Sequence, residues 1–248
     1  MTTKFTFHHL IDLYNTYSTR YQHETYKHVS SILQEAKHLH KEYFFRSDAV
    51  QTKMAKGETV DHEQSWRAFK GKNLEKLIEH LIKEECQKLG VTVINGNRLE
   101  RSKHLTSELQ QVKDNLTITY QNGDKHLPDV DLVAYDPQTF RVLCVLSSKV
   151  TLRERVSQTA YWKMKFLQSP QTSHINVFFV TLDEDGTLTH RFPVKKGRTI
   201  VENELDGTYV LTTSPVETSE TIHLFPSLMR DISHLKNENN TIHAPVLV

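Results

Sequence analysis

The stretch "PDVDLVAYDPQTFRVLCVLSSK", residues 128–149, contains two apolar runs separated by "YDPQTF" at residues 135–140. Proline and aspartate in that segment are typical of a turn, and the runs on either side have the valine and leucine content of strands. We therefore expect an antiparallel hairpin. Outside it, strand-like and helix-like segments follow one another, which predicts an α/β fold with a mixed central sheet flanked by helices.

Acidic residues and a lysine are expected to meet at one edge of this sheet. Asp129 and Asp131 stand two residues apart at the start of the first strand and share a face, as do Ser147 and Lys149 at the end of the second. A carboxylate there can hold Mg²⁺, and a lysine can position an attacking water, the minimal set for phosphodiester hydrolysis. The alternative is that these are surface residues at strand ends.

A helix is predicted directly after the hairpin, from Thr151. Thr151 and Glu154 have the spacing of a capping box, which explains the helix start without any function. Two arginines at positions 153 and 155 flank that glutamate. They lie off the apolar stripe expected to be buried, which consists of Leu152, Val156, Ala160, Met164 and Leu167.

The rest of the chain divides into three expected regions. Residues 1–60 form an N-terminal helical region of two or three helices, with a polar connection over residues 48–64. Residues 61–235 are expected to form the main domain, and residues 236–248 a tail. Within the second region we expect a helix over 73–90 capped by Asn73 and stopped by Gly90, strands near 91–96, 174–188 and 208–213, a turn at Asn122–Gly123, and a last helix over 225–237.

Composition excludes several classes of protein. The 248 residues have a formal net charge of +1, so a polyanionic partner must meet a local basic patch. No apolar run approaches the roughly 18 residues that a transmembrane helix needs, and the N-terminus lacks the layout of a secretion signal. Cys86 and Cys144 are too few for a disulfide framework, and the 15 histidines show no zinc spacing. A cytoplasmic protein is expected.

The pattern "PDVDLV" followed by "VLSSK" resembles the active-site signature of the PD-(D/E)XK nucleases, which include most type II restriction endonucleases. The chain departs from that signature at Ser147, where the family has an acid. A Ser-x-Lys variant occurs in the branch that reads sites with a CCGG core, the BsaWI-like enzymes. The resemblance covers about residues 66–185 and implies that the domain expected over residues 61–235 is the catalytic and DNA-reading domain.

That branch continues after the lysine with K-x-x-x-R-(D/E)-R-x-x-E. The chain has Lys149, Arg153, Glu154 and Arg155 at the matching positions, and Gln158 in place of the last glutamate. The resemblance implies that these residues read C·G pairs. Their chemistry agrees, because arginine donates in a fork to guanine O6 and N7 and glutamate accepts from cytosine N4.

A distant carboxylate must then replace the acid missing at Ser147. In some relatives it lies 13 or 14 positions beyond the lysine, but those positions hold Trp162 and Lys163 here. We favour Glu75, which flanks an apolar helical stripe, over Glu79 one turn on. Asp131 and Glu75 are the expected metal ligands, with Asp129 as the alternate. The segment "WRAFKGK", residues 66–72, adds a candidate phosphate contact at Lys72.

Taken together, the resemblance implies a Mg²⁺-dependent type II restriction endonuclease that acts as a homodimer on double-stranded DNA in a prokaryotic cytoplasm. A palindromic site with a C/G-rich core would match the two-fold symmetry of such a dimer. One alternative is a repair or structure-selective nuclease of the same superfamily. Another is a catalytically impaired DNA-binding module, which Ser147 favours.

Overall fold

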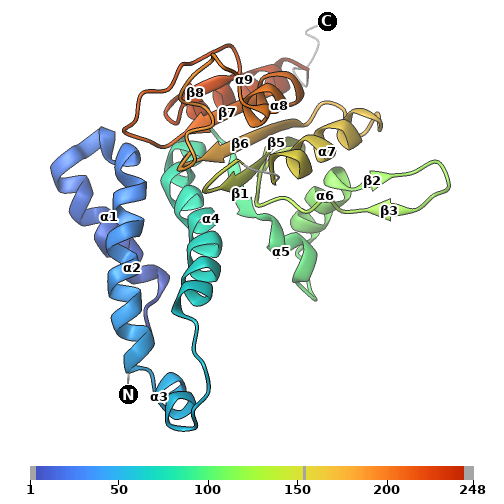
Figure 1. The fold of residues 1–248 in the computed structure, drawn as a ribbon. Helices are drawn as coiled ribbons and strands as arrows, with labels where there is room; N and C mark the ends of the chain where they lie inside the picture. Colours follow the sequence, from blue (N-terminus) through green and yellow to red (C-terminus); the bar gives the residue numbers. More distant parts are fainter. Residues whose placement is uncertain (1–3, 153–154, 243–248) are drawn as a thin grey trace, which may run out of the picture.

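The computed structural model describes residues 4–152 and 155–242 (Figure 1). The N-terminal helices are α1 (Phe7–Tyr21), the 3₁₀ helix η1 (Gln22–His28), α2 (Val29–Arg46) and α3 (Asp48–Ala55). The remaining elements are α4 (His62–Lys88), β1 (Thr92–Asn95), α5 (Gly96–Arg101), α6 (Ser107–Leu116), β2 (Ile118–Thr119), β3 (Lys125–His126), β4 (Leu132–Tyr135), β5 (Val142–Lys149), α7 (Arg155–Leu167), β6 (Asn176–Thr181), α8 (Lys196–Glu204), β7 (Gly207–Val210), β8 (Ile222–Leu224) and α9 (Ser227–Ile242).

The predicted hairpin is β4 and β5, which pair antiparallel with Leu132 opposite Leu146. β1 pairs antiparallel with β4, whereas β6, β7 and β8 continue from β5 in parallel. The strand order is β1-β4-β5-β6-β7-β8. This confirms the α/β fold with a mixed central sheet flanked by helices. The turn at Asn122–Gly123 is also confirmed, and it joins β2 to β3 with Gly123 at φ 87°.

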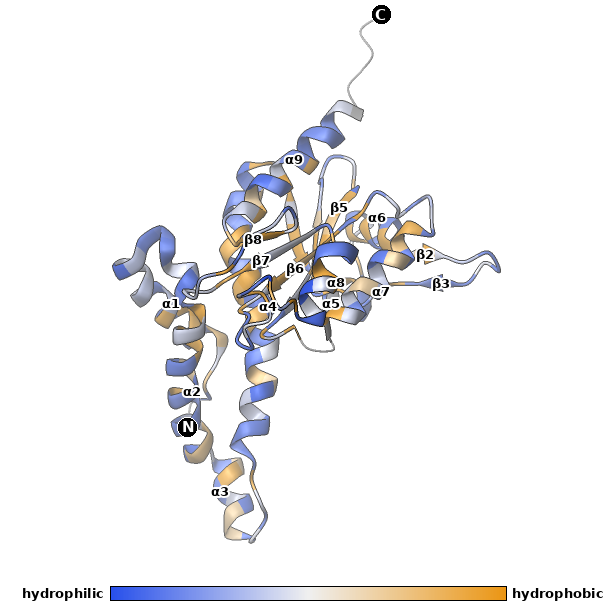
Figure 2. Ribbon diagram, turned by 45° about the horizontal axis from the view of Figure 1, so that its top comes forward, coloured by the Kyte–Doolittle hydropathy of each residue, from blue (hydrophilic) through white to orange (hydrophobic). Residues whose placement is uncertain are grey.

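Each face of the sheet is covered by helices. The side chains of Leu132, Leu146 and Phe178 pack with α4, α9 and the N-terminal helices, whereas Val133 and Val145 pack with α5, α6, α7 and α8. The central strands of the large sheet are accordingly mostly apolar, whereas much of the helical surface is hydrophilic (Figure 2). Burial on both faces is the reason that β4 and most of β5 read as continuous apolar runs in the sequence.

The N-terminal helices form an arm beside α4. We use "arm" for α1, η1, α2 and α3; α3 is the part farthest from the sheet (Figure 1). Phe5, Leu10 and Ile32 from this end of the chain belong to the same buried cluster as Leu77 of α4 and Leu132 of the sheet. The arm therefore shares a core with α4 and the sheet rather than having one of its own.

Helix α4 begins eleven residues before the predicted start. Its N-cap is Asp61, whose side chain accepts from the Gln64 N–H at 3.0 Å. The prediction that Asn73 caps this helix was wrong: Asn73 is buried within it and donates to the Phe69 carbonyl. Aromatic packing extends the helix, because Trp66 stacks on Phe69 against the arm. The connection predicted over 48–64 also contains a helix, α3.

The stripe predicted for the helix after the hairpin was partly wrong. Leu152, Val156 and Ala160 are buried, but Met164 and Leu167 are 52% and 56% exposed. Trp162 and Phe166 are buried instead, so beyond Ala160 a different face of α7 packs against the core. The proposed capping box includes Glu154, which lies outside the described residues.

The last helix, α9, runs through Ile242 and so extends beyond residue 235, where a tail was expected to begin. Lys236 pairs with buried Asp136 at 2.7 Å, and buried Asn239 donates to the same carboxylate. These contacts hold the helix to the β4–β5 turn.

Helices α5, α6 and α8 had not been predicted. Within residues 4–152 and 155–242, no helix combines the length and apolar character needed to cross a bilayer.

Candidate active site

Lys149 and Asp131 meet at the open end of the β4–β5 hairpin, as the sequence predicted. The Lys149 ammonium lies 2.7 Å from Oδ2 of Asp131, and the two side chains are 18% and 14% exposed. Antiparallel pairing produces this contact, because Asp131 directly precedes β4 and Lys149 ends β5. A partly buried ion pair at a strand end is positioned by the backbone rather than by flexible side chains.

The serine that contacts the aspartate is Ser148, which the sequence analysis had not selected. Its backbone N–H donates to Asp131 Oδ2 at 2.6 Å, and its hydroxyl lies 3.3 Å from the same oxygen. Ser147, the position of the missing acid, is half-buried in β5 and pairs in register with Phe179 of β6. The hydrogen bonds and the ion pair that the Asp131 side chain makes with described residues all fall on Oδ2.

Glu75 brings a second carboxylate to the site from α4. Burial, reinforced by the Asp131 carboxylate, raises the pKa of Glu75 to about 7, while Lys149 and a hydrogen bond from Asn95 act in the opposite direction. Glu75 is therefore close enough to Asp131 and Lys149 to interact with both. Asn95, at the end of β1, had not been predicted, and its own oxygen accepts from the Asn97 N–H.

Two other acidic candidates lie less centrally. Asp129 is exposed, although it is near enough to Glu75 to contribute to that residue's raised pKa. Glu79 follows one turn after Glu75 and is half-buried; burial raises its pKa, opposed by Lys83 and Lys76. Asp131 and Glu75 are thus the carboxylates brought together with the lysine.

These two carboxylates suit a hard divalent cation. Within the part of the chain that the structure describes, no cluster of three or more His, Cys, Asp or Glu side chains could hold a metal ion. Mg²⁺ does not need such a cage, because it keeps several waters and is often bound by one or two carboxylates together with substrate phosphates. A cation placed between the Glu75 and Asp131 carboxylates would also lower the raised pKa of Glu75, because it offsets the repulsion between the two negative charges.

A cleft of about 860 Å³ opens at this site. Its lining joins α4, the end of β5, the segment after β6 and the start of α8, and it contains more basic than acidic side chains. The charged residues that line it are Arg67, Lys70, Glu75, Lys149, Lys195 and Lys196. A cleft of this charge fits a polyanion, which the overall charge of +1 did not reveal.

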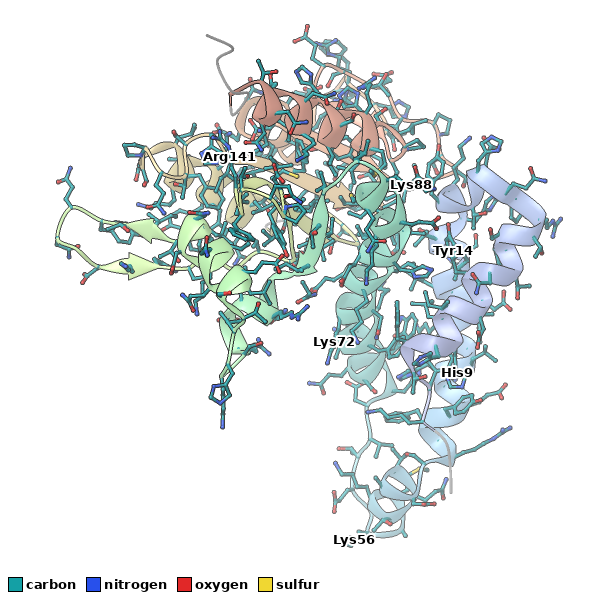
Figure 3. The ribbon with its side chains drawn as sticks, turned by 180° about the vertical axis from the view of Figure 1, so that it is seen from behind. His9, Tyr14, Lys56, Lys72, Lys88 and Arg141 are labelled. Carbon is teal, nitrogen blue, oxygen red and sulfur yellow. The ribbon has the colours of Figure 1, made fainter. Side chains whose placement is uncertain are left out.

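A second hollow of about 1080 Å³ adjoins the first along α4. The two share Arg67, Gly71 and Glu75, so Glu75 faces both. Lys72 lines the second hollow and is exposed on α4 (Figure 3). The segment 66–72 had indicated basic residues at this place, but Arg67 and Lys70, rather than Lys72, reach the cleft that contains Lys149.

Two of the four candidate base-reading residues, Arg155 and Gln158, belong to α7. Arg153 and Glu154 lie outside the described residues, and Arg155 is the first residue of the helix. Gln158 is exposed on α7, and its neighbour Ser157 lines the cleft. The start of α7 therefore borders the cleft.

Lys195 and Lys196, which also line the cleft, had been missed, although the run "KKGR" at residues 195–198 was a visible basic signal.

Comparisons with known proteins find similarity to type II restriction enzymes. A family model described as BsaWI restriction endonuclease type 2 matches residues 108–231. MjaVIP of Methanocaldococcus jannaschii, a predicted type II restriction enzyme, is 32% identical over 221 residues, which is 85% of this chain and 94% of that protein. HpyAORF263P of Helicobacter pylori, named in the same way, is 33% identical over 172 residues, 69% of this chain and 88% of its own.

A solved structure, that of PspGI, agrees at the level of the fold. The restriction endonuclease PspGI in complex with substrate DNA superposes with a TM-score of 0.53 at 15% identity, covering 92% of this chain and 93% of that chain. The BsaWI–DNA pre-specific complex has a TM-score of 0.46 at 15% identity, covering 97% and 95%.

Proposed function

Because the chain belongs to the BsaWI family of type II restriction endonucleases, we propose that it hydrolyses both strands of duplex DNA at a short palindromic site with a C/G-rich, CCGG-like core, using Mg²⁺. The observation that carries the proposal is the Lys149–Asp131 pair with Glu75 beside it, inside a basic cleft that the start of α7 borders. Nucleases of this superfamily generally use a divalent metal.

In this proposal each catalytic residue has a separate role. Asp131 and Glu75 would hold the metal, with Asp129 as the alternate acid, and Glu75 would supply the carboxylate that Ser147 lacks. Bound Mg²⁺ would lower the pKa of a coordinated water and neutralise charge on the scissile phosphate. The Lys149 ammonium, held by Asp131 at 2.7 Å, orients the attacking water and stabilises developing negative charge. Ser148 fixes the Asp131 carboxylate by its backbone N–H.

Specificity is assigned to the start of α7. Arg153 and Arg155 would donate to guanines, and Glu154 would accept from cytosine, each good bidentate contact being worth about 1–3 kcal/mol of discrimination. Gln158 stands where the family has a glutamate and would contact the neighbouring base pair. Lys72 would hold the backbone phosphates, which position the duplex without reading it.

The proposal includes a homodimer in a prokaryotic cytoplasm, where duplex DNA lies. One chain carries one Lys149–Asp131 pair, whereas a palindromic duplex presents two antiparallel strands to cut. Two copies related by a two-fold axis match that symmetry.

A plasmid digest with mapped ends tests the proposal. With Mg²⁺ the wild-type protein should give discrete fragments, and Lys149→Ala should lower the cleavage rate about 10²–10⁴-fold while leaving DNA binding within a few-fold. Lys53→Ala, an exposed lysine on α3, is the matched control and should cut normally. Unchanged fragments from Lys149→Ala would refute the site. A smear or junction-specific nicks would select a different nuclease, and binding without hydrolysis an impaired module.

A further inference from the structure

The loop between β6 and α8 carries the most exposed of the large apolar side chains that the structure describes. Phe192 is 82% exposed, and Val194, two residues on, is 50% exposed. Single exposed apolar residues are ordinary on protein surfaces, so exposure alone says little. Three further observations, on the anchoring, the charge and the position of this loop, separate Phe192 from an ordinary surface residue.

Both ends of the loop are fixed to the body of the protein. Before Phe192, the Thr189 carbonyl accepts from the Glu217 N–H at 3.3 Å, and the Arg191 N–H donates to Glu217 Oε2 at 2.6 Å. After it, the Lys195 ammonium donates to the Gly186 carbonyl at 2.9 Å. The tip is therefore presented to solvent by an anchored base.

A wholly buried arginine supports this base. Arg198 has no exposed surface, and it donates to the Leu188 carbonyl at 2.7 Å and to the Glu217 carbonyl at 2.6 Å. Its remaining partner is the Glu202 carboxylate at 3.1 Å. Burying a cation is costly unless it is fully paired. The fold thus uses a buried charge to join the two segments from which the loop projects.

The loop begins with the acidic run 183–185, but its second half is basic and continues into the cleft. From Thr187 to Val201 the sequence contains His190, Arg191 and three further basic residues but no aspartate or glutamate. Lys195 and Lys196, which follow the tip, line the same cleft as Lys149. The charge and position of this second half therefore fit the polyanion that the cleft would hold, rather than another protein.

From this geometry we infer that Phe192 is a DNA-contacting residue that packs against base pairs flanking the cleaved core, while Arg191 and Lys196 contact the adjoining phosphates. The inference rests on the proposed function, since it places duplex DNA in the cleft. Apolar side chains carried by basic segments act as wedges between base steps and help a protein to hold a distorted duplex. Phe192 would in this way add affinity and sequence preference beyond the residues at the start of α7.

Fluorescence provides a direct test through the variant Phe192→Trp. The two native tryptophans, Trp66 and Trp162, are only 4% and 7% exposed, so acrylamide should quench chiefly the introduced indole. Adding a short CCGG-core duplex in Ca²⁺, which prevents turnover, should reduce that quenching severalfold. Quenching that stays unchanged while fluorescence anisotropy reports a bound duplex overturns the inference. Protection that appears without DNA and grows with protein concentration assigns the residue to a protein interface and also overturns it.

Affinity provides the second measurement. Phe192→Ala should weaken binding of the same duplex about tenfold, and Phe192→Trp should retain most of it, because stacking survives. Met54→Ala, which truncates another exposed apolar residue on α3, should bind as the wild type does. Equal affinity of Phe192→Ala and wild type overturns the inference alone. A wild-type protein that binds no duplex overturns the proposed function as well, so the two failures are distinguishable.

Discussion

At the residue scale, the site brings the carboxylates of Glu75 and Asp131 and the ammonium of Lys149 together where α4 meets the β4–β5 hairpin. Glu75 is half-buried, and its pKa of about 7 reflects burial and the Asp131 charge. The metal-free protein therefore carries unfavourable electrostatic energy here at alkaline pH, where Glu75 is ionised. A folded-state pKa above the usual value means that stability is lost as pH rises through about 7.

Glu75→Gln removes that charge without changing the shape of the side chain. In EDTA at pH 8 we expect the variant to be more stable than wild type by about 1–2 kcal/mol in the free energy of unfolding. Adding Mg²⁺ should raise the melting temperature of the wild type and not that of the variant, because only a protein that binds metal in the folded state gains from it. Cleavage should be lost.

The matched control is Glu58→Gln, an exposed glutamate between α3 and α4, which should change neither measurement. A variant that is stabilised by Mg²⁺ as much as the wild type would show that the metal lies elsewhere.

Sequence reasoning succeeded at this scale where spacing alone sets geometry. The distance along the hairpin predicted that Lys149 would meet Asp131, since antiparallel register follows from the turn. The choice of Glu75 as the second carboxylate remains a prediction of role, although the structure brings its side chain to the pair. Ser148 was missed because its main contact uses the backbone N–H, which carries no residue-type signal.

At the element scale, α4 and the segment after β6 both line the cleft. Lys70 of α4 and Glu184 of that segment are joined by an ion pair of 3.3 Å, with side chains 22% and 33% exposed. A phosphate entering the cleft would have to compete with Glu184 for Lys70. The pair therefore opposes DNA binding modestly, by the value of a partly exposed ion pair, about 0.2–1 kcal/mol.

Glu184→Gln should therefore tighten duplex binding. At low salt, without divalent metal, we expect the dissociation constant to fall about two- to fivefold, because Lys70 is released and a negative charge beside the cleft is removed. The gain should fade at high salt, where such interactions are screened. Fluorescence anisotropy across a salt series measures both effects. Weaker or unchanged binding at low salt would contradict this account of the ion pair.

Where α2 of the arm meets the start of α4 there is a second titratable feature, a buried histidine pair. His40 Nδ1 lies 3.2 Å from His62 Nε2, among the rings of Phe44, Trp66 and Phe69. Burial lowers the pKa of His40 to about 4, with His62 and Lys4 adding to the effect; burial also lowers the pKa of His62. The folded protein therefore binds fewer protons than the unfolded chain between about pH 4 and 6.5.

It follows that stability should fall as pH is lowered through that window, with His40 accounting for about 2 kcal/mol. His40→Gln keeps a polar partner for His62 but cannot take up the proton, so its free energy of unfolding should depend less on pH between 6.5 and 4. Chemical denaturation at several pH values measures this. His80→Gln, exposed on α4, should keep the wild-type slope, and an equal slope in His40→Gln would refute the assignment.

Element boundaries were the least predictable feature, and tertiary packing explains why. The segment 62–72 is too polar to show a helical stripe, yet it is helical because Trp66 and Phe69 pack against the arm. Likewise, α7 buries Trp162 and Phe166 where periodicity favoured Met164 and Leu167, because the surrounding helices and strands, rather than α7 alone, decide which face is covered.

At the scale of the whole molecule, the arm, α4 and one face of the sheet share a continuous core. The division at residue 60 remains a prediction about domains, but this shared core connects the arm to the helix that carries Glu75. Truncation of the arm would expose the buried side chains that it covers. The fold class was predictable because strands buried on both faces leave long apolar runs; the arrangement of the arm was not, since no local pattern specifies a distant packing partner.

The proposed homodimer leads to a prediction about how the two strands are cut. If each copy cuts one strand, the wild type should convert supercoiled plasmid to linear DNA within one binding event. A heterodimer of wild type and Lys149→Ala, isolated through two different affinity tags after co-expression, should instead accumulate nicked circles, because only one Lys149–Asp131 pair is intact. Gel electrophoresis over time distinguishes the two products. Linearisation by the heterodimer at the wild-type rate would mean that a single site cuts both strands in turn, and that the two-fold argument from palindromic symmetry does not apply to this chain.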